Sequence, residues 1–516
     1  MKEKIFPMDM LPFHPYDKTD EVDQYYAGVA TQIYQILKAS DISVVLADEE
    51  KIRHTAMALT GYFEDIISET GIWQTFSMTC KRRYGTYVPF YETDEDYYAD
   101  EINPQDVCFL LWRLVQNFYR KEAKVVNPLN EALHYIASAI YATFDSLYED
   151  APVNQRMKDF LAERIDPNDP LSIEKRIIWF YNNYLQTDNL FDIPRLVERV
   201  SHEGALRESD KEMVIKDSLY NLYYNGRNNL LCLPNHEWLA LLMQNHPDHA
   251  LFENLKALEN SFYEVTEDES GCFYLKDLHK EPGERTGLKL ASKNIAGEAL
   301  PLRSQLTPGK SIVSCRLTFV GGCYYINGDY VALPLNDDFL KSAAEYREEQ
   351  KNAEENRLAA FHDFMYATGN KFFIFLKDAH ELADFFEKRL NYAPGDKMNF
   401  GKDLKGGIML AATPQGGLTF HSGSTEGVKS EDNPFYNPAE AGEKAFVLVV
   451  SPDNIGYQLS CILQDKGALA DARMNSDNPE DGHKLVQKYM DCWRDLFFHK
   501  CREKDFDNDA ELQKYL

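Results

Sequence analysis

The sequence predicts an α+β protein, with a large, mainly helical N-terminal half and an α+β C-terminal half that contains short antiparallel strands. Three observations predict this class. Apolar residues recur at helical spacing up to about residue 262. From about residue 271, segments rich in β-forming residues are separated by glycine and proline residues typical of turns. After residue 337, helical and strand patterns alternate. Because 516 residues exceed what one core can hold, we predict two domains, 1–262 and 263–516, with a β-hairpin region at about 271–335.

The helical half shows the same pattern in successive segments. In the first of these, Val22, Tyr25, Val29, Ile33 and Ile36 recur at intervals of three or four residues, which is the spacing of one helical face. The same spacing runs through QDVCFLLWRLVQNFYR, LNEALHYIASAIYATFDSLYE, LSIEKRIIWFYNNYLQ, DKEMVIKDSLYNLYYNG and HEWLALLMQNH. The sequence therefore predicts a succession of amphipathic helices.

An Asn-Pro pair precedes several helical patterns, at Asn103, Asn127, Asn437 and Asn478. Asparagine is a favoured N-cap residue, and proline suits the first helical position because its missing N–H would have no partner there. The four pairs therefore predict helix starts.

The C-terminal half mixes strands and helices. SIVSCRLTFVGGCYYINGDYVALPL predicts at least two strands, and Asn327-Gly328 predicts a type I′ hairpin turn between Tyr325 and Tyr330. Gly321-Gly322 is a second turn dipeptide. Further elements are predicted as a charged helix over about 337–367, a strand in KFFIFLKD, a helix over 379–391, a β pair in GGIMLAATPQGGLTFHSG, and closing helices near 438–450, 454–465 and 482–500.

The chain carries a formal net charge of −28, which disfavours bulk nucleic-acid binding because nucleic acids are polyanions. Residues 271–320 depart from this balance, with eight cations against four acids and a local charge of +4. The eight cations are Lys276, Lys280, Arg285, Lys289, Lys293, Arg303, Lys310 and Arg316. This segment is interpreted either as solvated strand ends or as a face that binds a small anionic ligand or a partner.

The nine cysteines form no Cys-x-x-Cys pair, and the N-terminus has no apolar signal region. Reduced thiols and a cytoplasmic location are expected. No uninterrupted apolar run approaches the ~20 residues of a membrane span, so no membrane association is predicted.

The segment HSGSTEGVKSEDNPFYNP, residues 421–438, contains many residue types that are common in catalytic sites. It does not match a phosphate-binding loop, because three residues separate Gly423 from Gly427 and Val428 stands where the lysine should be. It does not match a nucleophile elbow either, because Thr425 occupies the position of the serine. In NHEWLALLMQNH, Ala240 replaces the second histidine of a zinc-peptidase motif. The sequence predicts no metal site and identifies no cofactor.

Two charged clusters have a structural interpretation. The first cluster lies on a predicted helix and contains Glu64, Asp65 and Glu69. It predicts an exposed acidic helix face, and the alternative is a functional site built from carboxylates. The second cluster lies near the C-terminus and contains Asp471, Arg473, His483, Asp491 and Arg494. This cluster predicts ion pairs around a terminal helix.

Several sequence segments resemble an uncharacterised domain-of-unknown-function family found mainly in Bacteroidetes. They are LPFHPYDK…VDQYY (11–26), GYFEDIISETGIWQTF (61–76), YGTYVPFY (84–91), YYADEINPQDVCFLLW (97–112), YEDAPVNQRM (148–157), DNPFYN (432–437) and ALADARMNS…GHKLVQKYMD (468–491). The resemblance implies an intracellular bacterial protein with a helical N-terminal part, and it implies no activity or catalytic residue. The likeness is weakest at about 271–335.

We therefore expect a binding or scaffolding protein with a protein partner. The alternative is an enzyme of unrecognised type, with an acid/base site between the last β pair and the C-terminal helices. The candidate catalytic residues of that site are His421, Glu426, Asp432, Asp471 and His483. A third possibility is a nucleic-acid role for the basic segment 271–320.

Overall fold

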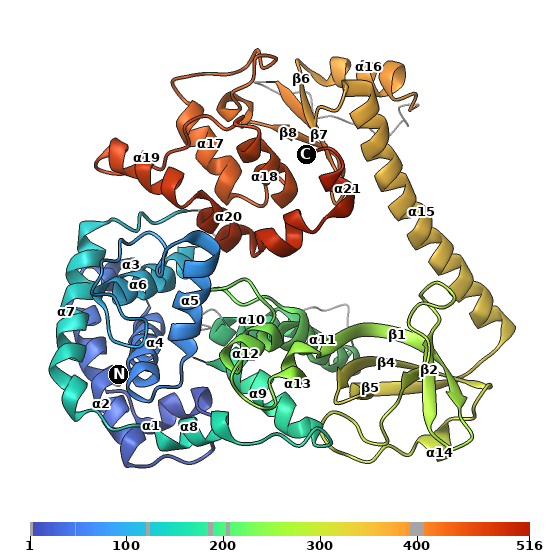
Figure 1. Ribbon diagram of the computed structural model, residues 1–516, viewed down its shortest axis with the longest axis horizontal. Helices are drawn as coiled ribbons and strands as arrows, with labels where there is room; N and C mark the ends of the chain where they lie inside the picture. Colours follow the sequence, from blue (N-terminus) through green and yellow to red (C-terminus); the bar gives the residue numbers. More distant parts are fainter. Residues whose placement is uncertain (1–3, 47, 120–123, 184–188, 203–206, 393–406) are drawn as a thin grey trace. The chain divides into compact units, whose positions relative to one another are not determined.

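The computed structural model describes residues 4–46, 48–119, 124–183, 189–202, 207–392 and 407–516. Helices and two small antiparallel sheets make up the fold, which confirms the predicted α+β class with a helical N-terminal half (Figure 1). The chain forms two compact units. Unit 1 contains residues 1–120 and 131–349, and unit 2 contains residues 121–130 and 350–516.

The predicted division at residues 262 and 263 lies inside the first strand of the chain, which begins at residue 256. The contacts thus place the first sheet in the same unit as the preceding helices. The division of the chain into a mainly helical domain, 1–262, and an α+β domain, 263–516, stays a prediction.

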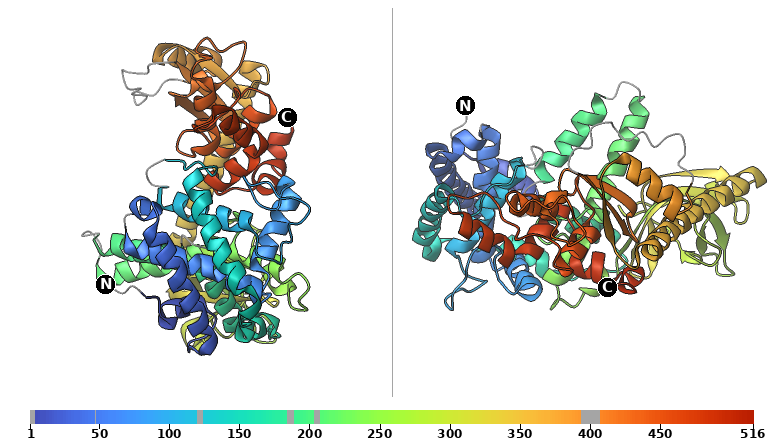
Figure 2. Two further views of the ribbon diagram at one scale, coloured as in Figure 1. Left: turned by 90° about the vertical axis from the view of Figure 1, so that its left-hand side faces the viewer. Right: turned by 90° about the horizontal axis from the view of Figure 1, so that it is seen from above.

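Helices occupy the first half of unit 1. They are α1 (Pro7–Met10), η1 (Leu11–Phe13), α2 (Glu21–Ala39), α3 (Ile42–Leu46), α4 (Glu49–Ile67), α5 (Ile72–Tyr84), α6 (Pro104–Tyr119), α7 (Glu131–Leu147), η3 (Tyr148–Asp150), α8 (Gln155–Ala162), α9 (Pro170–Asn182), α10 (Asn189–Ser201), α11 (Glu208–Tyr220), η5 (Asn221–Asn225), α12 (Asn235–Leu242) and α13 (Ala250–Glu253). Helices α2, α4, α6 and α7 pack side by side (Figures 1 and 2). None of the helices in the described ranges combines the length and the apolar character that a membrane span requires.

Aromatic side chains fill the core between these helices. The rings of Phe63 on α4 and Phe144 on α7 stack with centroids 4.8 Å apart, and Tyr62 meets Trp73 edge to face at 5.2 Å. Further along, Phe180 on α9 packs edge to face against Trp238 on α12 at 5.1 Å. The amphipathic periodicity of the sequence thus corresponds to helix interfaces rich in buried aromatic side chains.

The prediction of an exposed acidic face on α4 is wrong, because Glu64 and Asp65 are both buried. Nε2 of His14 lies 3.0 Å from Oε2 of Glu64, and Nδ2 of Asn154 donates to Oε1 of Glu64 at 2.7 Å. Buried carboxylates need such partners because burial removes their hydration.

Asp65 accepts hydrogen bonds from the first amides of α5. Its Oδ1 accepts from the N–H of Ile72 at 3.0 Å and its Oδ2 from the N–H of Trp73 at 2.7 Å, and the hydroxyl of Thr70 donates to the same carboxylate. The side chain therefore satisfies amides that a helix start leaves unpaired. The carboxylate pair has a structural role that sequence spacing did not show.

A five-stranded antiparallel sheet follows in unit 1. Its strands are β1 (Lys256–Glu267), β2 (Phe273–Asp277), β3 (Leu288–Lys289), β4 (Ser311–Val320) and β5 (Cys323–Pro334), in the order β3-β2-β1-β4-β5. The residues after β3 join the two edges, because Leu290 forms a parallel bridge with Tyr324 and the N–H of Ile295 donates to the carbonyl of Ile326 at 2.9 Å. The sheet thus curls into a small barrel around an apolar core (Figure 1).

The two strands predicted in 311–335 are confirmed as β4 and β5, and so is a turn at Gly321-Gly322, but the type I′ hairpin turn predicted at Asn327-Gly328 is wrong. Val320 pairs with Cys323, so the turn is Gly321-Gly322. Asn327-Gly328 lies inside β5 at an irregularity of the β4–β5 register, where Gly328 has φ +83°. A Cβ atom at Gly328 would lie 2.8 Å from Nη2 of Arg316, so this glycine allows a bulge to form beside a buried arginine.

The long predicted helix is confirmed as α15 (Asp337–Thr368), which begins in unit 1 and ends in unit 2. Unit 2 continues with β6 (Phe373–Leu376), α16 (Ala379–Arg389), β7 (Ile408–Thr413), β8 (Gly417–Ser422), η6 (Thr425–Gly427), α17 (Ala441–Val450), α18 (Tyr457–Asp465), α19 (Pro479–Lys488), α20 (Met490–Phe498), η7 (Glu503–Asp507) and α21 (Ala510–Gln513). The antiparallel sheet β6-β7-β8 buries both faces of β7, one against α15, α16 and α18 and the other against α17 and α18.

Two details of unit 2 differ from the predictions. The last predicted helix is two helices, α19 and α20, which meet near Tyr489. Helix α17 begins at Ala441 with Glu440 as its N-cap residue, so Asn437 does not cap it. Asn437 instead accepts a hydrogen bond from the N–H of Ala439 in the preceding turn. The Asn-Pro prediction is confirmed at Asn478, whose side chain accepts from the N–H of Glu480. It is also confirmed at Asn103, since α6 begins at Pro104, but it is wrong at Asn127, because α7 begins only at Glu131.

Candidate functional site

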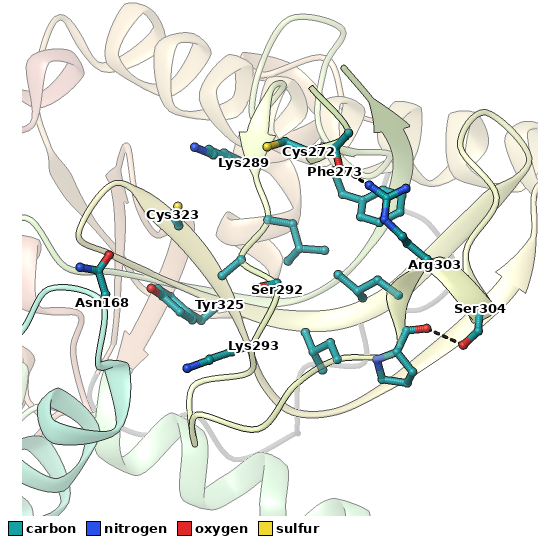
Figure 3. A pocket seen from close by; sticks show the side chains of 16 residues that line it. Asn168, Cys272, Phe273, Lys289, Ser292, Lys293, Arg303, Ser304, Cys323 and Tyr325 are labelled. Atoms are coloured by element: carbon teal, nitrogen blue, oxygen red, sulfur yellow. Dashed lines mark hydrogen bonds between the residues drawn. The ribbon is translucent and has the colours of Figure 1, made fainter. Parts of the chain in front are cut away.

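A pocket with a volume of about 790 Å³ lies on the barrel of unit 1 (Figure 3). Its walls come from the start of β2, from β3 and the residues after it, from the start of α14 (Leu302–Gln305) and from the start of β5. The loop before α9 adds Asn168. All of these segments belong to unit 1, and 16 residues line the pocket.

Three cations line the pocket, namely Lys289, Lys293 and Arg303, and none of its 16 described lining residues is acidic. In Figure 3 the two lysines point to the side where Asn168 and Tyr325 lie, whereas Arg303 and Ser304 lie at the other side. The pocket therefore offers positive charge on a chain whose net charge is −28.

The charge of Arg303 is largely compensated. Its Nη1 lies 2.9 Å from Oε1 of Glu267, and its Nη2 donates to the carbonyl of Gly271 at 2.7 Å. The guanidinium also lies 5.5 Å from the ring centroid of Phe273. Arg303 thus holds the β1–β2 loop against α14 and contributes little net charge.

Lys289 and Lys293 supply the uncompensated charge. Both side chains are exposed, and within the described residues neither has a carboxylate within 4.0 Å. By contrast, Lys276, Arg285 and Arg316 from the same basic segment pair with Glu264, Asp277 and Asp217. Lys289 and Lys293 are thus the pocket-lining cations of this segment that have no carboxylate partner among the described residues.

Local pairing sets the position of these lysines. Lys289 lies opposite Tyr274 in the β2–β3 ladder, and buried Leu288 and Leu290 on either side of it point into the barrel core. Lys293 forms an antiparallel bridge with Ala299 across a short loop, in which the carboxylate of Glu298 accepts from Nδ2 of Asn294 at 2.9 Å. The alternation of a strand therefore directs Lys289 outward.

Tyr325 gives the pocket an aromatic wall with a polar end. It is 7% exposed, and burial raises the pKa of its phenol above the usual value, with further effects of Cys323, Asp166 and Asp169 in the same direction. The neutral hydroxyl is a hydrogen-bond donor and acceptor. Gly321 lets the 166–168 loop approach β5, because a Cβ atom there would lie 2.7 Å from the carbonyl oxygen of Pro167.

The predicted acid/base residues all lie in unit 2. His421 is the second-last residue of β8, with Nδ1 2.7 Å from the carbonyl oxygen of Asn454 and Nε2 2.9 Å from the hydroxyl of Thr419. Burial lowers the pKa of His421. Both ring nitrogens therefore have partners in the fold, and burial favours the neutral form of the ring.

The other four candidates have separate surroundings. Asp432 pairs with Lys371, Asp471 is exposed, and His483 lies half-buried on α19. Glu426 lies in η6, and its Oε2 is buried with no hydrogen-bond partner in the described chain. Within the described residues, no hydrogen bond or ion pair joins any two of the five candidates, whose acid/base role stays a prediction.

The expectation of ion pairs around the terminal helix is confirmed for Arg494, which is fully buried on α20. Its Nη1 lies 3.2 Å from Oδ1 of Asp491, its Nε donates to the hydroxyl of Ser460 at 3.1 Å, and it also donates to Gln464. The other arginine of that sequence cluster, Arg473, packs against Gly442, where a Cβ atom would lie 2.7 Å from its Nε. These contacts are structural.

The positive local charge of residues 271–320 is the sequence feature that indicates the pocket, because this segment contains all three lining cations. The aromatic and apolar walls had no such signal. The sequence marks Tyr325 only as a neighbour of a predicted hairpin turn, and Asn168 lies more than a hundred residues before the basic segment. Within the described residues, no group of three or more His, Cys, Asp or Glu side chains could hold a metal ion.

The model of one protein family matches most of the chain, at residues 4–282 and 315–497, and its description is "Protein of unknown function (DUF3843)". Residues 283–314, which contain Lys289, Lys293 and Arg303, lie between the two matched ranges. No curated protein and no solved structure matches the chain.

Proposed function

Since the chain belongs to the DUF3843 family, whose function is unknown, we propose from the chemistry of the pocket that it is a binding protein for an anionic ligand. The observation that carries this proposal is the pair of uncompensated lysines, Lys289 and Lys293, in a pocket whose described lining has no acid. An ammonium group on a flexible stem binds phosphate and carboxylate as a point charge.

The overall negative charge does not oppose binding at this position. Charges separated by more than about 8 Å are largely screened at physiological ionic strength, so the local balance of the pocket decides the interaction. Apolar walls at Leu290, Leu300 and Leu302 add a surface for the uncharged part of a ligand. A concave site with mainly apolar walls and a few directed polar groups is the usual form of a small-molecule site.

The test is isothermal titration calorimetry of the full chain with tripolyphosphate at low salt. We expect saturable binding, and we expect K289A/K293A to weaken it by at least about tenfold, which corresponds to about 1.4 kcal/mol. The matched control is K341A/K351A, which removes two exposed lysines from α15. Failure to bind at low salt, or equal weakening by the control, would falsify the proposal.

The other expectations stay predictions. For a protein partner, the support is that Val331 and Leu333 expose apolar side chains on the same face of β5. For an acid/base site in unit 2, the support is the unpartnered carboxylate oxygen of Glu426. The bacterial origin and the cytoplasmic location rest on the sequence alone.

A further inference from the structure

The strands of the barrel form a closed ring in the order β1-β2-β3-β5-β4-β1. Antiparallel ladders join β1 to β2, β2 to β3, β4 to β5 and β4 to β1. The remaining connection, between the end of β3 and β5, is parallel, through the bridge of Leu290 to Tyr324 and the hydrogen bond from the N–H of Ala291 to the carbonyl of Tyr324 at 2.9 Å. This ring is the strand order of the OB fold, a five-stranded, partly open Greek-key barrel.

Two further features suit this architecture. The register of β1 against β4 shifts between Leu258 and Ser261, which is the kind of bulge that lets one long strand bend around a barrel. Helix α14 lies between β3 and β4 in the chain, and Leu302 in it and Leu306 after it pack into the barrel core. The helix thus helps to close the apolar interior.

The pocket occupies the face that this architecture uses for ligands. Its lining includes residues of β2 and β3, Gly271 and Cys272 from the β1–β2 loop, and Cys323 directly after the β4–β5 turn. Barrels of this kind bind oligonucleotides and oligosaccharides on the β2–β3 face between those two loops. Strand order alone does not select a ligand, so the choice has to come from the side chains.

The side chains select an anion with a flat, apolar part. Lys289 and Lys293 favour a phosphate over a neutral sugar, and Tyr325, which lies between them in Figure 3, lines the pocket with the 7% of its surface that is exposed. Tyr274 lies directly opposite Lys289 in the ladder and is half-buried, so a second aromatic ring adjoins the same cation. Cations interleaved with aromatic rings are the pattern that binds single-stranded nucleic acid, through phosphate contacts and base stacking.

We propose that the barrel of unit 1 binds a short single-stranded nucleic acid at the face formed by Lys289, Lys293 and Tyr325. This inference rests on the proposed function and specifies its ligand. The net charge of −28 opposes long polyanions, which repel the rest of the surface, so the binding site covers only a few nucleotides. A duplex stacks its bases inside, so it cannot present them to Tyr325.

The experiment is fluorescence anisotropy of a labelled 12-nucleotide oligothymidylate with the full chain over a range of salt concentrations. We expect saturable binding that weakens with salt and a clear preference over a duplex of the same length. K289A/K293A should weaken binding at least about tenfold and make the slope of log K against log salt shallower by about 1.4, as expected for two lost phosphate contacts to a single strand. K341A/K351A on α15 should leave both quantities unchanged.

A second variant pair isolates stacking. Y325L keeps an apolar side chain in this position and removes the ring, and we expect severalfold weaker binding, whereas Y325F keeps the ring and should bind as the parent does. Circular dichroism and thermal denaturation of each variant establish that the barrel is folded. If Y325L and K289A/K293A both bind like the parent, the oligonucleotide does not use this face and the inference is wrong.

Competition separates this inference from the proposed function. Displacement of the oligonucleotide by adenosine monophosphate at equal concentration would identify a mononucleotide as the ligand and overturn the single-strand assignment. Equal affinity for tripolyphosphate would show that the base is not recognised, which overturns this inference and leaves the anion-binding function standing. Absence of binding to both tripolyphosphate and the oligonucleotide would overturn both.

Discussion

Nε2 of His14 lies 3.0 Å from Oε2 of Glu64, although 50 positions separate the two residues in the chain and each side chain is only 1% exposed. On its other side, Nδ1 of His14 lies 3.5 Å from Oδ1 of Asp23, whose Oδ2 accepts from Nη2 of Arg156 at 2.6 Å. Burial lowers the pKa of His14, but Glu64 and Asp23 outweigh it and raise that pKa above its usual value. A buried network of opposite charges therefore holds the N-terminal segment against α2 and α4.

Loss of His14 should be strongly destabilising. In H14Q the carboxylates of Glu64 and Asp23 stay buried with one cation fewer, and we expect the free energy of unfolding to fall by about 3 kcal/mol. Urea denaturation followed by circular dichroism measures the change. The control is H249Q, because His249 forms an exposed pair with Glu253 at 3.6 Å in the same unit, and such pairs contribute at most about 1 kcal/mol. Equal effects of the two variants would contradict a buried charge network.

Asp106 should make unit 1 less stable as the pH rises from about 4 to about 7. Burial raises the pKa of this carboxyl to about 7, although the hydroxyls of Tyr62 and Tyr97 and the amide of Asn103 donate to it and act in the opposite direction. A folded-state pKa above the unfolded value means that the folded state binds the proton more tightly. The stabilisation is complete below the unfolded pKa and is lost as the pH rises through the folded one.

The measurement is urea denaturation between pH 4 and pH 8 for the parent and for D106N. We expect D106N to show a smaller fall in stability over this range, because its amide does not ionise. D145N is the control, since Asp145 is an exposed acid on α7. A parent and D106N with the same pH profile would refute the buried protonation.

Gly427 should tolerate no side chain. In the loop that looked catalytic by composition, a Cβ atom at Gly427 would lie 2.5 Å from the amide nitrogen of Ala445 on α17. Because the obstacle is backbone, G427A must displace α17 or the loop, and we expect a loss of at least about 2 kcal/mol. G456A is the matched control, as Gly456 also has an ordinary φ and nothing within 4 Å of its added Cβ. Thermal denaturation compares the two, and similar midpoints would rule out this close approach.

His421 and His14 should titrate in opposite directions from the usual histidine value of about 6.5. Burial lowers the pKa of His421, whereas the carboxylates raise that of His14. The His421 contribution to stability is therefore lost as the pH falls below about 6.5, and the His14 contribution is lost as it rises above that value. NMR of ¹³C-labelled histidine, assigned with H421N and H14Q, measures both values. A pKa of His421 above about 6.5 would contradict the effect of its burial, and His421 would then remain a candidate general base.

The helices were predictable because their signals are local. Periodicity in 337–367 corresponds to α15, and the Asn-Pro rule holds at Asn478, where the cap needs only neighbouring residues. The same rule fails at Asn437, because turn residues 438–440 separate that pair from the start of α17 at Ala441. The hairpin rule fails at Asn327-Gly328 as well. The ladder with β4 places this pair beside Arg316 inside a strand, and the turn falls at Gly321-Gly322.

The sequence by itself determined the α+β class, the helical first half and the unusual positive charge of residues 271–320, since all three depend on composition and short-range spacing. Only the tertiary structure decided which of those cations are free to bind a ligand. Glu267 compensates Arg303, while the closure of β3 against β5 directs Lys289 and Lys293 into one pocket with Tyr325. Glu64 illustrates the same limit, because burial and the partner His14 come from a segment 50 residues away. Contacts between distant segments set the electrostatic environment of a side chain, and no local pattern encodes them.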